Sequence, residues 1–180
     1  MAHEIETKVL DIDAEVFKEK IISLGAVKVQ ETRLVVDWYR LKGVKEGNDP
    51  WFLRIRSNSE GKHEVTWKAK SDILGTARKH KEINFFIDDQ KKMSDLFESI
   101  GLENYAHQEK DRISYDLKDW HFDLDTYPKM PAYLEIEGTS EELVNEAIKL
   151  LGLENHKTWA KGERILIQEI YGLDWYKMNF

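Results

Sequence analysis

Charged side chains recur in pairs two residues apart along much of this sequence. The pairs are Glu4/Glu6, Arg54/Arg56, Lys68/Lys70, Lys110/Arg112, Asp123/Asp125 and Glu135/Glu137. Because side chains in a β-strand alternate between its two faces, both members of a pair point to one side and the apolar residue between them points to the other. One charged face is ordinarily a solvated face. Its repetition over so many strands favours charged faces that meet around a shared interior.

These residue types suit one kind of ligand, because guanidinium and ammonium groups bind phosphate oxygens. The candidate basic residues are Lys8, Arg54, Arg56, Lys68, Lys70, Arg78, Lys110 and Arg112. The candidate metal ligands are Glu4, Glu6, Asp123, Glu135 and Glu137, whose carboxylates are the hard oxygen donors that Mg²⁺ or Mn²⁺ prefers. Burying both signs in a dry interior costs several kcal/mol per ion. The interior is therefore predicted to hold water, or a polyphosphate together with a divalent metal.

Capping signals predict the helices that must cover the outside of such a sheet. Asp13 begins a helix that Gly25 ends, Asp88 or Asp89 begins one that Gly101 ends, and Ser140 begins one that Gly152 ends. A last helix is predicted over residues 158–171, although Gly162 weakens it. The segments between them indicate about eight strands. We therefore predict an α+β fold, with an eight-stranded antiparallel β-barrel, a charged lumen and helices packed outside.

Length and composition narrow the remaining possibilities. A chain of 180 residues without a linker-like segment predicts one domain over residues 1–180. The net charge of -7 argues against nucleic acid or an anionic membrane as the main partner. Cysteine is absent, which excludes disulfides and thiolate metal sites, and no signal-peptide pattern is present. A cytoplasmic protein that is a monomer or homodimer is expected.

The order of these motifs resembles a known family. Glu4-Ile5-Glu6-Thr7-Lys8 resembles the ExExK signature of the CYTH family, the triphosphate tunnel metalloenzymes, which include class IV adenylyl cyclases and thiamine triphosphatases. The later basic pairs and the closing Glu135/Glu137 pair follow in the same order, so the resemblance covers roughly residues 1 to 170. It implies an antiparallel tunnel that binds triphosphate through its basic residues and a divalent metal through its acids.

The sequence departs from the family pattern at two places. Relatives commonly carry an E-x-E pair where this chain has Glu82 and Asn84, which lowers the negative charge there. The segment of residues 158–162 matches only loosely, and Lys161 is carried over from it as a substrate-binding residue.

The resemblance implies a metal-dependent triphosphatase that hydrolyses a phosphoanhydride of inorganic triphosphate, thiamine triphosphate or a nucleoside triphosphate. Arg54, Arg56, Lys110 and Arg112 would stabilise charge in the transition state, while Lys8 and Lys68 would hold the other phosphates. Either Glu82 or Asp125 would accept a proton from water. Two alternatives remain open: a class IV-type adenylyl cyclase that makes cyclic AMP and pyrophosphate, and a non-catalytic polyphosphate or nucleotide binder.

Three further side-chain groups have expected places. The six histidines are interpreted as surface or lumen-edge residues rather than metal ligands, and His80 and His121 are the two candidates for inward faces, beside Glu82 and Asp123. Trp38 is expected in the core rather than at a tunnel mouth. The apolar C-terminal segment of residues 175–180 is expected to pack on the barrel or on a partner subunit.

Overall fold

A computed structural model describes residues 3–45, 47–70, 72–74 and 77–180; within these, the side chains of residues 3, 4, 72–74 and 78–80 lie outside the described part. The strands are β1 (His3–Ile12), β2 (Val27–Leu41), β3 (Trp51–Asn58), β4 (His63–Ala69), β5 (Asp72–Leu74), β6 (Ala77–Ile87), β7 (Leu102–Leu117), β8 (Trp120–Thr126), β9 (Ala132–Gly138) and β10 (Thr158–Trp159). The helices are α1 (Ala14–Ser23), α2 (Gln90–Ser99), α3 (Glu141–Leu151), α4 (Glu163–Glu169) and the 3₁₀ turn η1 (Trp175–Lys177).

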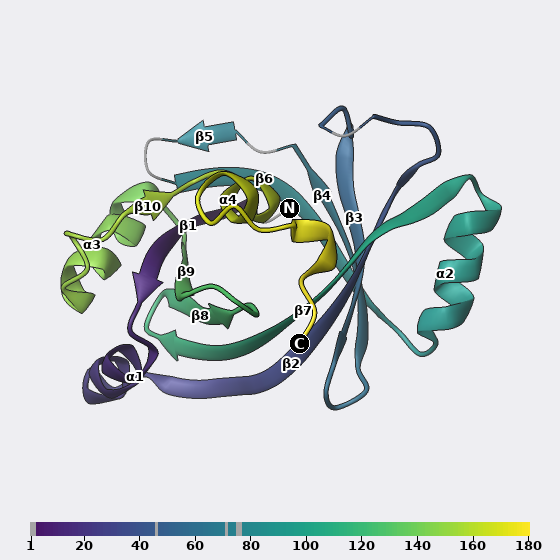
Figure 1. Ribbon diagram of the computed structural model, residues 1–180. Helices are drawn as coiled ribbons and strands as arrows, with labels where there is room; N and C mark the ends of the chain where they lie inside the picture. Colours follow the sequence, from purple (N-terminus) through teal and green to yellow (C-terminus); the bar gives the residue numbers. More distant parts are fainter. Residues whose placement is uncertain (1–2, 46, 71, 75–76) are drawn as a thin grey trace.

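The strands form one antiparallel sheet that curls around a shared interior (Figure 1). Their hydrogen-bonded order is β1-β9-β8-β7-β2-β3-β4-β6, and a short ladder over residues 3–6 of β1 joins β6 back to β1. Each of these eight strands therefore has a strand neighbour on both sides. Short β5 and β10 extend the sheet beside β6 and β1, so it has ten strands. The predicted α+β fold with a tunnel-like antiparallel sheet is confirmed.

The three predicted caps are confirmed. The Asp13 carboxylate accepts hydrogen bonds from the backbone N–H groups of Glu15 and Val16 at 3.1 Å, which satisfies donors that a helix start leaves free. Asp89 and Ser140 do the same for α2 and α3. Gly152 ends α3 at φ 73°, a left-handed conformation that glycine adopts without strain.

The last predicted helix is shorter than expected. Residues 158–159 form β10 and pair with Lys8 and Val9 of β1, and α4 begins only after Gly162. The prediction of one helix over residues 158–171 was therefore wrong. Gly162 occupies the extended N-cap position at ψ 154°, so the helical pattern of the sequence holds only for residues 163–169.

Alternation along β1 sends neighbouring side chains into different cores. Val9 packs outside the sheet with α1 and α3, in a cluster that includes Phe122 and Ile136. Leu10 packs with α4 and η1, in a second cluster that includes Tyr133 and Trp175. A third cluster lies between β3 and α2. Helices α1, α2 and α3 thus cover apolar faces on the outside of the sheet, whereas α4 and η1 pack on the face of β1 and β9 that also carries Lys8 and Glu135.

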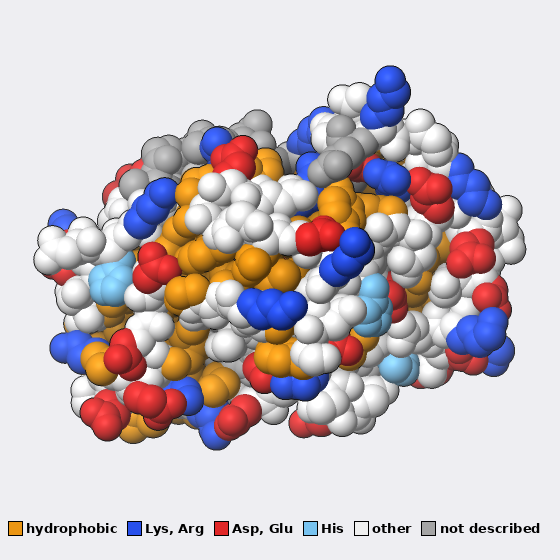
Figure 2. All heavy atoms as spheres, viewed as in Figure 1, with side chains coloured by type: hydrophobic (Ala, Val, Ile, Leu, Met, Phe, Trp, Pro, Cys, Tyr) orange, Lys and Arg blue, Asp and Glu red, His pale blue; other side chains and the backbone are white. Residues whose placement is uncertain are grey.

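The C-terminal segment packs against the sheet, as predicted. The Glu109 N–H of β7 donates to the Met178 carbonyl at 2.8 Å, and Trp175 is buried. On the molecular surface, hydrophobic side chains gather over the middle of this face, where α4 and the C-terminal segment lie, with charged side chains spread around them (Figure 2).

Candidate active site

The inward strand faces surround a cavity of about 810 Å³. Ten basic and seven acidic side chains are among the residues that line it. The basic ones are Lys8, Arg54, Arg56, Lys62, Lys68, Lys70, Lys110, Arg112, Lys161 and Arg164, and the acidic ones are Glu6, Glu64, Glu82, Asp123, Glu135, Glu137 and Glu163. Such a surplus of cations around one cavity favours a polyanionic ligand.

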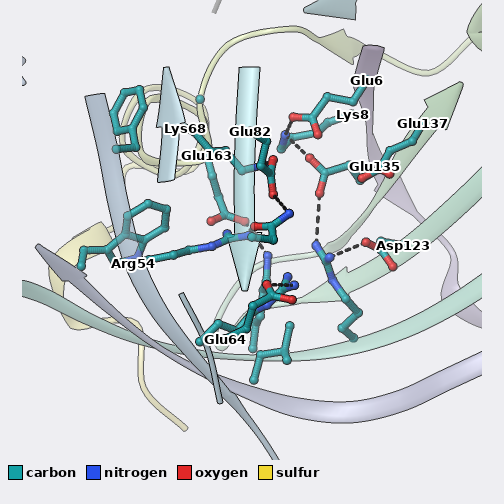
Figure 3. Close-up of a pocket in the computed structure, with 18 of the residues that line it drawn as sticks. Glu6, Lys8, Arg54, Glu64, Lys68, Glu82, Asp123, Glu135, Glu137 and Glu163 are labelled. Atoms are coloured by element: carbon teal, nitrogen blue, oxygen red, sulfur yellow. Dashed lines mark hydrogen bonds and ion pairs between the residues drawn. The ribbon is translucent and has the colours of Figure 1, made fainter. Parts of the chain in front are cut away.

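Three carboxylates meet where β1 runs beside β9. In this ladder Glu6 lies opposite Glu137 and Lys8 lies opposite Glu135. One oxygen from each of Glu6, Glu135 and Glu137 lies within 4.8 Å of the others, and Figure 3 shows these side chains together on one side of the cavity. A set of hard oxygen donors at this spacing fits the coordination chemistry of Mg²⁺ or Mn²⁺.

Lys8 holds this acidic group together. Its Nζ lies 2.6 Å from a Glu135 oxygen and 3.6 Å from a Glu6 oxygen, and all three residues are buried. A lysine between two buried carboxylates offsets part of their mutual repulsion. The ExExK motif at the start of the chain thus places both acids and the base on the same face of β1.

Arg112 of β7 is surrounded by acids from β8 and β9. It forms a two-point contact with Asp125 at 2.6 and 2.7 Å, contacts Asp123, and donates to Glu135 at 3.1 Å. Burial works against the charged form of Arg112, but the acids outweigh it and raise its pKa well above the ordinary value. For Asp123, burial is also outweighed, here by Arg112 and His121, and its pKa falls to about 2.

Lys110 joins the sheet to α4. Its Nζ lies 2.8 Å from Asp125 and 2.9 Å from Glu163, the first residue of α4. The Tyr133 hydroxyl also donates to Glu163. Burial opposes the charge on Glu163, but Lys110, Tyr133 and Lys8 together lower its pKa to about 2. Glu163 is therefore an ionised carboxylate at the base of the cavity.

The opposite wall, from β3, β4 and β6, carries further pairs. Arg56 donates to Glu64 at 2.8 Å, and Lys68 lies 2.5 Å from Glu82, which also accepts from Asn84 at 2.7 Å. Burial and the neighbouring cations Arg54 and Arg112 lower the pKa of Arg56. Since a guanidinium remains protonated in proteins, Arg56 stays charged, and the lowering reflects chiefly its burial.

Arg54 differs from the other cations of the strands. Among the described residues it has no carboxylate or hydrogen-bond partner, and its Nε atom is buried and unpaired. Its guanidinium lies 5.6 Å from the ring centre of Trp38, and Figure 3 shows it reaching across the cavity toward the acids. A buried donor without a partner carries a desolvation cost that an anion in the cavity would remove.

Most of the predicted site residues lie around this cavity. All predicted basic residues except Arg78 line it, with Lys70 and Lys161 at exposed positions. The predicted acids Glu6, Glu82, Asp123, Glu135 and Glu137 line it too. The side chains of Glu4, Arg78 and His80 lie outside the described part of the chain.

Asp125 lies behind the lining rather than in it. It is 0% exposed, and both of its oxygens are taken by Lys110 and Arg112. This placement gives Asp125 contacts that orient two cations. His121, one of the two candidate histidines, lines the cavity and lies 3.2 Å from Asp123. Trp38, expected in the core, is half-buried and lines the cavity.

Four charged residues of the cavity were not predicted from the sequence: Lys62, Glu64, Glu163 and Arg164. Glu64 had a usable signal, because it lies two and four residues before Thr66 and Lys68 on the inward face of β4. Glu163 and Arg164 begin a short helix, and no strand periodicity marks them. Their position depends on how α4 packs against Leu10 and Tyr133.

No helix in the described part of the chain combines the length and the apolar character needed to span a membrane.

Comparisons with known proteins agree with this geometry. Solved structures with the same fold include the PH1012 protein from Pyrococcus horikoshii OT3, 24% identical over 86% of this chain and 94% of that one, with a TM-score of 0.71. A candidate adenylate cyclase from Vibrio parahaemolyticus is 12% identical over 93% of this chain and 98% of that one, with a TM-score of 0.78.

The HpAC1 protein from Hippeastrum, described as having a dominant triphosphatase activity, is 14% identical over 99% of this chain and 100% of that one, with a TM-score of 0.69. No curated protein matches the sequence. The model of the CYTH domain matches residues 2–162, which is most of the chain. This protein therefore belongs to the CYTH domain family.

Proposed function

We propose that this protein is a divalent-metal-dependent triphosphatase, which binds an inorganic or organic triphosphate in the charged cavity and hydrolyses a phosphoanhydride bond. The observation that carries this proposal is the pairing of ten basic side chains with a compact carboxylate cluster in one cavity. CYTH family members are triphosphatases or adenylyl cyclases, which supports an enzyme of this kind. Among the described lining residues, cations outnumber carboxylates by three, which favours a polyanion such as a triphosphate.

Each group of residues has a part in the proposed reaction. Glu6, Glu135 and Glu137 would hold Mg²⁺ or Mn²⁺, with Asp123 beside them; the bound metal supplies polarisation of phosphoryl oxygens. Arg54 and Arg56 bind phosphate oxygens from the β3 side of the cavity.

On the β7 side, Lys110 and Arg112 stabilise charge that develops on the phosphoryl group in the transition state. Asp125 keeps these two cations oriented. They are therefore in place before the substrate arrives, so less reorganisation is needed during the reaction.

The β4 and β6 side supplies the proton acceptor. Glu82 lines the cavity, whereas Asp125 is 0% exposed with both oxygens engaged. Of the two carboxylates that the sequence offered for this part, Glu82 is therefore the better placed to accept a proton from water. Lys68, at 2.5 Å from Glu82, orients this carboxylate and would bind a phosphate oxygen.

A second candidate function is an adenylyl cyclase that uses the same cations and acids. It is favoured by one observation: aromatic side chains line the cavity next to Arg54. They are Trp38, Phe52, Tyr105 and Trp175. An organic group attached to the triphosphate can pack against such rings.

The test is phosphate release with Mg²⁺ or Mn²⁺ from inorganic triphosphate, thiamine triphosphate and ATP, with cyclic AMP measured in parallel. Free phosphate from at least one substrate is expected, and Glu6→Gln should reduce it by at least about a hundredfold. Glu19→Gln is the matched control, because Glu19 is exposed on α1. Cyclic AMP and pyrophosphate without phosphate would favour the cyclase. Tight binding without any product would favour a non-catalytic binder. Unchanged activity in the Glu6→Gln variant would place the active site elsewhere.

A further inference from the structure

The interactions that orient Arg54 differ from those of the neighbouring cations. The other cations of the strand walls are each fixed by a carboxylate: Lys8 by Glu135, Arg56 by Glu64, Lys68 by Glu82, and Lys110 and Arg112 by Asp125. Arg54 has no such partner among the described residues. A long side chain without a fixed partner samples several rotamers, and ordering it on ligand binding costs entropy. Something other than an acid must hold it.

The indole of Trp38 is positioned to do so. Trp38 on β2 lies directly opposite Arg54 on β3 in the antiparallel ladder, so both side chains point into the cavity. The guanidinium carbon lies 5.6 Å from the centre of the indole ring, within the range of a cation–π interaction. An aromatic face orients a guanidinium without neutralising it, so the full positive charge stays available to an anion.

Trp38 is itself held by a buried hydrogen-bond chain. Its Nε1–H donates to the side-chain carbonyl of Gln108, which is 0% exposed. The Gln108 amide then donates to the Trp175 backbone carbonyl at 2.7 Å. The Trp38 and Trp175 rings also pack with their centres 5.4 Å apart. These contacts favour one orientation of the Trp38 indole, because turning it away would leave the buried side-chain carbonyl of Gln108 without this donor.

The C-terminal segment, which supplies the Trp175 carbonyl, is anchored on β7. The Glu109 N–H donates to the Met178 carbonyl at 2.8 Å, and the Phe180 N–H donates to the Glu109 carboxylate at 3.1 Å. Arg33 lies over the Phe180 ring at 3.9 Å. The C-terminal segment is thus fixed at several points, and it presents the Trp175 carbonyl to Gln108.

We propose that Trp38 is a positioning residue for phosphate binding, held by Gln108 and the Trp175 carbonyl so that its indole sets the orientation of Arg54. This inference rests on the proposed function, because it gives Arg54 a triphosphate to bind. It assigns to the C-terminal segment an indirect part in phosphate binding, which acts through Gln108 and Trp38 rather than by contact with the phosphates.

The test measures the affinity for inorganic tripolyphosphate by isothermal titration calorimetry, together with KM and kcat for its hydrolysis. Trp38→Leu removes the aromatic face and is expected to raise Kd and KM about tenfold, with a much smaller change in kcat. Trp38→Phe keeps a ring over Arg54 but loses the indole N–H, so Kd and KM are expected to rise about threefold. Gln108→Leu should raise both by a similar factor.

The deciding measurement is a double-mutant cycle. In an Arg54→Ala background, Trp38→Leu is expected to cause no further loss of tripolyphosphate affinity, because the residue that it positions is gone. A role confined to folding would give the same loss in both backgrounds, and that result would overturn the proposal. If Trp38→Leu does not fold, the cycle is run with Trp38→Phe, with the same two outcomes on a smaller scale.

A matched control separates this effect from a general loss of stability. Trp120 is also half-buried and also donates its indole N–H, to the Leu143 carbonyl at 2.9 Å, but it packs beside the α1 and α3 cluster outside the cavity. Trp120→Leu is expected to lower stability without changing Kd for tripolyphosphate. Binding without hydrolysis in the unmodified protein would contradict the proposed catalysis while the affinity cycle still decides the role of Trp38. An unmodified protein that binds none of tripolyphosphate, thiamine triphosphate and ATP would overturn both.

Discussion

Replacing Glu163 with glutamine is expected to destabilise the protein at neutral pH and to remove part of its acid sensitivity. The side chain of Glu163 is 14% exposed and contacts the Lys110 ammonium at 2.9 Å and the Tyr133 hydroxyl. Glutamine has nearly the same shape and can still accept from both groups, so the main change is the loss of the negative charge. Lys110 would then keep only Asp125 as a partner.

The magnitude follows from the pKa of Glu163, which is lowered from its ordinary value of 4.5 to about 2. Lowering the folded-state pKa means that the folded protein prefers the ionised form, so the stabilisation is present above pH 4.5 and is lost as the pH falls toward 2. This difference corresponds to about 3 kcal/mol at pH 7, and about half of that should remain near pH 3. The value is comparable to the cost of breaking a buried ion pair.

Urea unfolding followed by tryptophan fluorescence, at several pH values from 7 to 3, measures this effect. The quantity to compare is the free energy of unfolding of the unmodified protein minus that of Glu163→Gln. This difference should be largest at pH 5 to 7 and shrink below pH 4.5. The contributions of other carboxylates cancel in it, because they titrate alike in both proteins. Glu15→Gln is the control, since Glu15 forms an exposed pair with Lys18 worth less than about 1 kcal/mol. A difference that stays constant down to pH 3, or that is no larger than for the control, would refute this reasoning.

Two further predictions concern separate parts of the molecule. Glu137→Gln should weaken Mn²⁺ binding at least about tenfold in calorimetry, because it removes one of three oxygens that lie within 4.8 Å of one another; unchanged Mn²⁺ affinity would place the metal elsewhere. Ser140→Ala should lower the free energy of unfolding by about 1 kcal/mol without affecting turnover, because the Leu143 N–H loses its 3.2 Å cap; an effect on kcat would contradict the separation of α3 from the cavity.

The charged interior could be predicted from the sequence because it depends on a local rule. Alternation with period two assigns Arg54 and Arg56 to one side of a strand whatever the neighbouring strand is, and the ladders then bring such faces together. The caps at Asp13 and Ser140 are likewise local, since donor and acceptor lie within three residues. Features that depend only on such local rules can be predicted without three-dimensional information.

The parts that were missed depend on contacts between distant segments. Glu163 enters the cavity because α4 packs against Leu10, and the β10 pairing with Lys8 fixes where α4 begins. Neither contact leaves a periodic mark on residues 158–169. The burial of Asp125 is a similar case: its spacing from Asp123 gives it the same face of β8, but only the positions of Lys110 and Arg112 show that it lies behind the lining.

The pairing pattern explains how the fold tolerates so highly charged an interior. Lys8, Arg56, Lys68, Lys110 and Arg112 each gain an acid within hydrogen-bonding distance, so the Coulomb attraction of each pair offsets much of the cost of removing it from water. Such cations give up an existing partner when they bind a phosphate, which reduces their net gain. Arg54 gives up none among the described residues, because an indole rather than a carboxylate holds it. Of the interactions that an incoming anion makes with the strand cations, the one with Arg54 is therefore reduced least by the loss of an existing ion pair. Among these cations, Arg54 should contribute most to affinity.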